Sequence, residues 1–189
     1  MKKIAIFASG SGSNAEKIME YFKNHQSIKV SIVLTNKANA GVLERAKKFD
    51  IPTHIFDRST FRDTEEIVTL LQEQKIDLIA LAGFLWLIPK HMVEAFPNKI
   101  LNIHPALLPN YGGKGMHGMH VHLAVVQNHE QKSGMTIHYV NEKYDDGQII
   151  FQDSCNLLQS DTPEDVAAKV LKLEHLHFAR VIEEEIQKL

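Results

Sequence analysis

The segment KIAIFASGSGSNA, residues 3–15, is the part of the sequence that indicates the fold. It joins a short apolar run, Lys3–Ala8, to a glycine-rich turn and then to a stretch with helical spacing of apolar residues over Asn14–Lys23. A strand that continues through a glycine turn into a helix is the first half of a βαβ unit. Because parallel strands need such helical crossovers, this segment predicts an α/β protein with a parallel sheet.

The alternation of strands and helices continues along the chain. We expect further strands at 30–34, 53–56, 78–81 and 99–103, and helices at 41–49, 62–74 and 89–95. The stretch 105–118 has two prolines and four glycines and predicts a long loop. After this loop we expect a helix at 119–127, antiparallel strands at 135–140 and 148–154, and a last helix from about Thr162 to Gln187. The expected fold is Rossmann-like: a mostly parallel, twisted sheet of about seven strands with helices on both faces.

Composition limits the classes of protein that this chain can represent. The 189 residues, 44% of them hydrophobic, are enough for one domain with a sizeable core. A formal net charge of −2 argues against the broad basic surface that nucleic acid requires. The single cysteine excludes an intramolecular disulfide and fits a reducing compartment.

Neither of the two notable apolar runs predicts a membrane protein. The run after Lys3 has five residues before Ser9, too few for a signal peptide. The longest run, Leu78 to Ile88, is well below the roughly 20 residues that a helix needs to cross a bilayer. We therefore expect a cytoplasmic protein that has no membrane partner.

The glycine-rich turn predicts an anion site. Its last residues, Gly12, Ser13 and Asn14, open a helix whose free backbone N–H groups can bind a phosphate. The pattern also fits a dinucleotide fingerprint, but that class needs an acidic residue after the second strand, where this chain has Asn36 and Lys37. A small phosphate-bearing molecule is thus favoured over a dinucleotide, and a turn without any ligand stays open as the alternative.

Two polar side chains at the end of a buried strand are candidates for chemistry. Asn102 and His104 are separated by two residues, so an extended backbone directs both side chains to the same face. An amide donor beside an imidazole can stabilise an oxyanion and move a proton. Asp145, in the expected turn between the last two strands, can supply a carboxylate that raises the pKa of a nearby imidazole. The alternatives are a histidine that only ends a strand and an ordinary Asp-Asp-Gly turn.

Five segments occur in the order seen in a known enzyme family. They are Gly10–Asn14, Asn36–Ala38, Ala82–Phe84, Leu101–Pro109 and Tyr144–Gly147. Through them the sequence resembles the folate-dependent formyltransferases essentially from end to end. The block Asn-x-His-Pro-x-Leu-Leu-Pro is specific for the family. The Gly-x-Gly-Ser-Asn turn and the length resemble the branch of the family that acts on glycinamide ribonucleotide in purine synthesis.

The resemblance implies a reaction and a set of residues. A formyl group would pass from 10-formyltetrahydrofolate, the co-substrate, to the amine of glycinamide ribonucleotide, with no metal. Asn102, His104 and Asp145 would be catalytic, and Gly12, Ser13, Asn14 and Glu174 would bind the ribonucleotide. The folate would lie against Arg62, Thr64, Leu85, Trp86, Leu87, Ile88, Asn102, Val140 and Asn141. The resemblance also implies a single formyltransferase domain over 1–189, with a nucleotide-phosphate half at about 1–100 and a folate and catalytic half at about 101–189, acting as a monomer or homodimer.

Three positions depart from the family pattern. Thr64 stands where the family often has an arginine for the folate tail, and Arg62 is a possible substitute. Trp86 stands where a smaller or basic residue is common, so its ring would narrow the pterin pocket or stack on the pterin. The loop from Pro109 to His120 is longer and richer in glycine than usual.

Other functions remain as alternatives. His117, His120 and His122 form an H-x-x-H-x-H pattern that resembles a zinc site, although neither H-E-x-x-H nor a cysteine pair is present. A second alternative is another formyltransferase of the same fold, acting on methionyl-tRNA or an amino sugar, or a formyltetrahydrofolate hydrolase. A third is a non-catalytic domain that binds a phosphate through the first turn alone.

Overall fold

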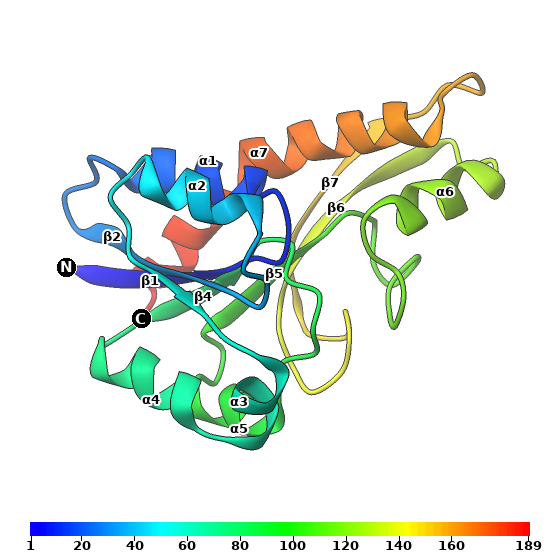
Figure 1. Cartoon of the computed structure of the whole chain (residues 1–189). Coiled ribbons are helices and arrows are strands. Elements are labelled where there is room, and N and C mark those ends of the chain that lie inside the picture. Colours follow the sequence, from blue (N-terminus) through cyan, green and yellow to red (C-terminus); the bar gives the residue numbers. More distant parts are fainter.

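The computed structural model describes all 189 residues and shows one seven-stranded sheet covered by helices on both faces (Figure 1). The strands are β1 (Lys2–Phe7), β2 (Ile28–Thr35), β3 (Thr53–Ile55), β4 (Leu78–Leu81), β5 (Ile100–His104), β6 (Lys132–Tyr139) and β7 (Ile149–Asn156). The helices are α1 (Ser13–Phe22), α2 (Gly41–Lys47), α3 (Arg58–Asp63), α4 (Glu66–Glu73), α5 (Lys90–Ala95), α6 (Met119–Gln127) and α7 (Pro163–Gln187).

The sheet is mostly parallel. Its order is β3-β2-β1-β4-β5-β6-β7; the first five strands of that order run parallel, and β6 and β7 pair antiparallel to their neighbours. All four residues of β4, Leu78–Leu81, are buried, as expected for a central strand with helices on both sides. The predicted fold class is therefore confirmed.

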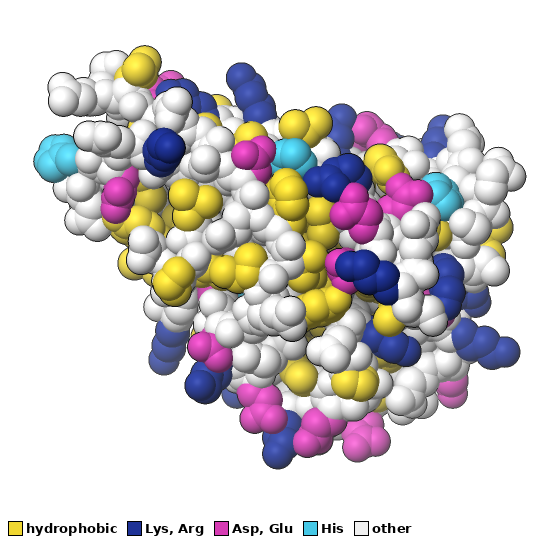
Figure 2. Space-filling view, turned by 180° about the vertical axis from the view of Figure 1, so that it is seen from behind, with side chains coloured by type: hydrophobic (Ala, Val, Ile, Leu, Met, Phe, Trp, Pro, Cys, Tyr) yellow, Lys and Arg dark blue, Asp and Glu magenta, His cyan; other side chains and the backbone are white.

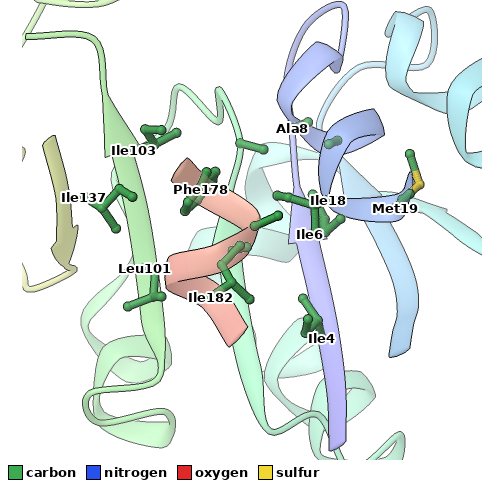
Figure 3. Close-up of a cluster of buried hydrophobic side chains, with 14 of the residues drawn as sticks. Ile4, Ile6, Ala8, Ile18, Met19, Leu101, Ile103, Ile137, Phe178 and Ile182 are labelled. Atoms are coloured by element: carbon green, nitrogen blue, oxygen red, sulfur yellow. The ribbon is translucent and has the colours of Figure 1, made fainter. Parts of the chain in front are cut away.

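Two hydrophobic clusters fix the helices to the sheet. On one face, apolar side chains of α1, α2 and α7 pack on β1, β5 and β6, with Ile6, Ile18 and Phe178 fully buried or nearly so (Figure 3). On the other face, Phe61 of α3 and Met92 of α5 pack on β1 and β4. The central strands of the sheet are therefore buried between two helical layers, whereas the edge strands β3 and β7 contain no buried residue.

The expected helix over 62–74 is wrong in one respect: the structure has two helices there. Asp57 caps α3 by accepting a hydrogen bond from the Thr60 N–H at 2.8 Å. Thr64 then leaves the helical conformation, with φ −130° and ψ 165°, and its hydroxyl donates to the Thr60 carbonyl oxygen and accepts from the Glu66 N–H. Thr64 thus ends α3 and opens α4, because its side chain bonds to the backbone on both sides.

The start of α7 is fixed by a capping box. The Thr162 hydroxyl accepts a hydrogen bond from the Asp165 N–H, the Asp165 carboxylate accepts one from the Thr162 N–H, and Pro163 occupies the first turn. This confirms the predicted helix start. The helix then crosses the sheet face and brings Glu174 to Asn14, in the first turn of α1.

No helix of the structure is both long enough and apolar enough to cross a membrane. On the face shown in Figure 2, Lys and Arg side chains are interspersed with Asp and Glu side chains. That distribution agrees with the nearly balanced formal charge of the sequence.

The contact between β6 and β7 depends on a glycine. A Cβ atom at Gly134 would lie 2.1 Å from the Asp153 carbonyl oxygen of the neighbouring strand, so Gly134→Ala should lower the free energy of unfolding by about 2 kcal/mol or more. The control is Ser133→Ala at the adjacent position, which removes a buried hydroxyl that has no hydrogen-bond partner and should cost little. Urea unfolding of both variants checks this, and equal stabilities would contradict it.

Candidate active site

A cleft of about 840 Å³ lies at the carboxyl end of the parallel strands. Its lining comes from the glycine turn before α1, the ends of β4 and β5, the loop after β5, the turn before β7, and α7. Ligands of open α/β sheets bind at this edge, where the strand ends leave room between the loops. The cleft therefore brings together segments that are far apart in the sequence.

The end of β5 supplies two of the predicted catalytic side chains. Asn102 and His104 both line the cleft, as their spacing on an extended strand predicts. The Asn102 Nδ2 atom lies 3.1 Å from the His138 Nε2 atom and 3.4 Å from the Asp145 Oδ1 atom. The strand pairing explains the first contact, because Asn102 lies opposite His138 in the β5–β6 ladder.

Asp145 is held in the middle of this polar group. Its Oδ1 atom is 3.4 Å from His104 Nδ1 and 3.7 Å from His138 Nε2, and its Oδ2 atom accepts a hydrogen bond of 2.9 Å from the Gly113 N–H. The residue adopts φ 52°, a left-handed conformation that aspartate tolerates in turns. The turn before β7 thus directs a carboxylate back toward the end of β5.

The charges of this group depend on burial. Burial lowers the pKa of His104, and the Asp145 carboxylate and the Tyr111 carbonyl oxygen only partly oppose that effect. The expectation that Asp145 raises the pKa of His104 is therefore right about the effect of the carboxylate and wrong about the net direction. Burial alone would raise the pKa of Asp145, but His138, His104 and the Gly113 N–H together bring it below its usual value.

The cleft also contains the predicted phosphate turn. Gly12 has φ 77°, and a Cβ atom there would lie 2.6 Å from the Val42 side chain, so only glycine fits. The Asn14 Nδ2 group donates a hydrogen bond of 2.7 Å to the Glu174 carboxylate, while the buried Asn14 Oδ1 atom has no partner. Burial raises the pKa of Glu174 to about 7, although the hydrogen bond from Asn14 acts to lower it.

Comparison with known proteins identifies the family. The formyl transferase family model matches residues 2–182. The chain belongs to this family. The phosphoribosylglycinamide formyltransferase of Bacillus subtilis is 35% identical over 189 residues, which cover 97% of this chain and 94% of that protein. The resemblance inferred from the sequence motifs is therefore confirmed.

Two further relatives agree with this assignment. The chloroplastic phosphoribosylglycinamide formyltransferase of Arabidopsis thaliana is 43% identical over 188 residues, which cover 96% of this chain and 64% of that protein, so the chain spans less than two thirds of that relative. The crystal structure of phosphoribosylglycinamide formyltransferase from Anaplasma phagocytophilum has a TM-score of 0.89 at 33% identity, and the match covers 99% of this chain and 88% of that one.

The residues expected to bind folate fall into three groups in this family member. Leu85 and Asn102 line the cleft. Arg62, Leu87 and Ile88 line a second cavity of about 560 Å³. Thr64, Trp86, Val140 and Asn141 line neither cavity.

Trp86 has a packing role in the structure. Its ring lies 5.8 Å from the ring of Phe61, 6.1 Å from that of Phe56 and 6.2 Å from that of Phe84, measured between centroids. These four rings form one aromatic cluster below the strand ends. Trp86 thus packs the segment after β4 against the residues around β3 and α3.

The cleft lining also includes residues outside the set predicted as substrate-binding or catalytic, among them Lys37, Lys114 and His122. His138 does not line the cleft but contacts Asn102. The alternation of β6 could have indicated His138, because it places this side chain on the same face as Thr136. Lys114 belongs to the glycine-rich loop after β5, so its position in the cleft depends on the path of that loop.

The histidine pattern does not form a compact ligand set. His117 and His122 line the cleft, whereas His120 is exposed outside it, with its ring 5.5 Å from that of His117. No three His, Cys, Asp or Glu side chains come together in an arrangement suited to a metal ion. The three histidines whose spacing in the sequence resembles a zinc site therefore do not form a metal-ligand set in the structure.

The raised pKa of Glu174 predicts a pH-dependent stability. Below the unfolded value of 4.5 both states hold the proton, and between that value and about 7 only the folded state does, so stability falls as pH rises. Between pH 4.5 and about 7 the wild-type protein should lose up to about 3 kcal/mol of its free energy of unfolding, and Glu174→Gln should abolish this loss. Unfolding in urea at pH 5 and pH 8 measures it, with the exposed Glu184→Gln on the same helix as control. The same pH dependence in wild type and Glu174→Gln would refute the assignment.

Proposed function

We propose that this protein transfers a formyl group from 10-formyltetrahydrofolate to the amine of glycinamide ribonucleotide in purine synthesis. The observation that carries the proposal is the convergence of Asn102, His104 and Asp145 in the cleft that also contains the phosphate turn. The names of the Bacillus subtilis and Arabidopsis thaliana relatives support it. A domain that only binds phosphate would have no use for this polar group.

In the proposed reaction the amine nitrogen forms a bond to the formyl carbon while the carbonyl electron pair moves onto oxygen. The Asn102 amide and the protonated His104 ring donate hydrogen bonds to that oxyanion, and the Asp145 carboxylate stabilises the charge on the ring. The bond from carbon to the folate nitrogen then breaks. One proton leaves the attacking amine and one is taken up by the departing nitrogen, which balances the transfer and needs no covalent enzyme intermediate.

The two substrates would occupy different parts of the cleft. The ribonucleotide phosphate would lie on the backbone of Gly12, Ser13 and Asn14, with its ribose next to Glu174. A ribose hydroxyl is a suitable donor for the unpartnered Asn14 Oδ1 atom. The pterin would lie near Leu85, and the folate tail would extend to the second cavity, where Arg58, Arg62 and Lys90 can attract its carboxylates.

The finer properties of the enzyme belong to the same proposal. We infer that the reaction needs no metal ion, that the protein acts as a monomer or homodimer, and that it works in the cytoplasm, although the Arabidopsis thaliana relative is named as chloroplastic. A formyltetrahydrofolate hydrolase of the same fold is the second candidate. It is distinguished by release of formate in the absence of the ribonucleotide.

An assay with both substrates tests the proposal. The purified protein, treated with a chelator, should formylate glycinamide ribonucleotide, and His104→Ala or Asp145→Asn should lower kcat at least a hundredfold because the oxyanion loses its charged donor. Calorimetry should show that both variants bind the ribonucleotide nearly as wild type does. No transfer by well-folded protein, formate release alone, or near-normal kcat in either variant would overturn the proposal.

The lysines of the cleft give a separate prediction. Lys37 and Lys114 are the only lysine or arginine residues in its lining, and neither takes part in a salt bridge within the protein. Lys114→Ala should raise the KM for the ribonucleotide about tenfold with little change in kcat, because the attraction to the phosphate acts equally in ground and transition state. Lys29→Ala, at the far end of β2, is the control. An unchanged KM would show that Lys114 does not contact the phosphate.

A further inference from the structure

The backbone of three consecutive residues contacts both proposed catalytic side chains. The Tyr111 carbonyl oxygen lies 2.7 Å from His104 Nε2, and the Gly113 N–H donates to Asp145 at 2.9 Å. Between them, a Cβ atom at Gly112 would lie 3.2 Å from the Asp145 Cβ atom and 2.6 Å from the Leu108 side chain. The segment Tyr111–Gly113 therefore lies directly against His104 and Asp145.

The contact with Tyr111 determines how the His104 ring is used. A carbonyl oxygen only accepts hydrogen bonds, so Nε2 must carry a proton. The other nitrogen, Nδ1, is then the one that faces Asp145, at 3.4 Å, which is longer than an ordinary charge-assisted hydrogen bond. Once protonated, Nδ1 is the N–H group of His104 available to an oxyanion.

Tyr111 is itself fixed through its side chain. Its hydroxyl donates a hydrogen bond of 2.7 Å to the Glu130 carboxylate and accepts one of 2.9 Å from Asn128 Nδ2. Both partners follow the end of α6, and the ring packs against the core cluster that includes α7. The backbone of Tyr111 has φ 57°, a left-handed conformation that is strained for a non-glycine residue. The side-chain bonds keep the residue in this conformation.

We infer that Tyr111 is a positioning residue: its hydroxyl, bonded to Glu130 and Asn128, holds its carbonyl oxygen on His104 Nε2 and so directs Nδ1 toward Asp145 and the cleft. The inference rests on the proposed function for its effect on catalysis. Its effect on the His104 ring does not depend on which substrates the enzyme uses.

The groups that face His104 determine what a titration will show. They are Asp145 from the turn before β7, His138 from β6 and His122 from α6. The Tyr111 carbonyl raises the pKa of His104, against burial and the neighbouring His138. Loosening Tyr111 should thus lower the pKa of His104 further.

The test is Tyr111→Phe, which keeps the ring and removes the hydroxyl. We expect kcat to fall about tenfold with the KM for the ribonucleotide within twofold of wild type, and the alkaline limb of the kcat–pH profile and the NMR titration of His104 to move to lower pH. Glu130→Ala should act in the same way, and Glu130→Gln should restore both readouts because its amide oxygen still accepts the bond.

Tyr21→Phe is the matched control, because the Tyr21 hydroxyl also bonds to a glutamate, Glu183, but lies outside the cleft. It should leave kcat and the His104 titration unchanged. Wild-type kcat and titration in both Tyr111→Phe and Glu130→Ala would overturn the inference, as would an equal effect of Tyr21→Phe. If wild type transfers no formyl group, the proposed function fails, and the His104 titration still decides the role of Tyr111.

Discussion

Asp145 is the largely buried charge on which the polar end of the sheet depends; its side chain is 11% exposed. A carboxylate out of water must be compensated, and here an imidazole from β5, an imidazole from β6, an amide from β5 and a backbone N–H from the glycine loop surround it. These groups meet only if β5 and β6 pair in the register that places Asn102 opposite His138. The compensation of one charge therefore couples the site to the pairing of two strands.

Much of the fold could be predicted because it is encoded locally. The buried run of β4, the glycine turn before α1 and the capping signal at Thr162 each depend on neighbouring residues, and each appears where the sequence indicates. The division between α3 and α4 was missed because Thr64 is compatible with a helix, and only its bonds to Thr60 and Glu66 make it a break. Apolar periodicity does not contain that information.

The candidate site likewise has a part that the local sequence predicts and a part that depends on contacts across the fold. Asn102 and His104 could be predicted because a spacing of two on a strand fixes their common direction. The alternation of β6 indicates the face on which His138 lies, but its contact with Asn102 depends on strand register. The contact of Tyr111 with His104 depends on the path of a glycine-rich loop. The packing of Trp86 on Phe56 and Phe61, which belong to an earlier segment of the chain, likewise depends on how the chain folds. Contacts across the fold decided each of these roles.

Apart from the Asp145 carboxylate, whose pKa is lowered, the buried titratable groups of the cleft favour their uncharged forms, and the lysine charges lie near solvent. Burial lowers the pKa of His104 and raises that of Glu174 to about 7, so both side chains favour the uncharged form more than they would in water. Lys37 and Lys114, by contrast, are exposed and unpaired. The two lysines can therefore attract an anionic substrate at little cost in desolvation. The positive charge of protonated His104 stabilises an oxyanion most strongly beside Asp145, in a part of the cleft where few water dipoles compete.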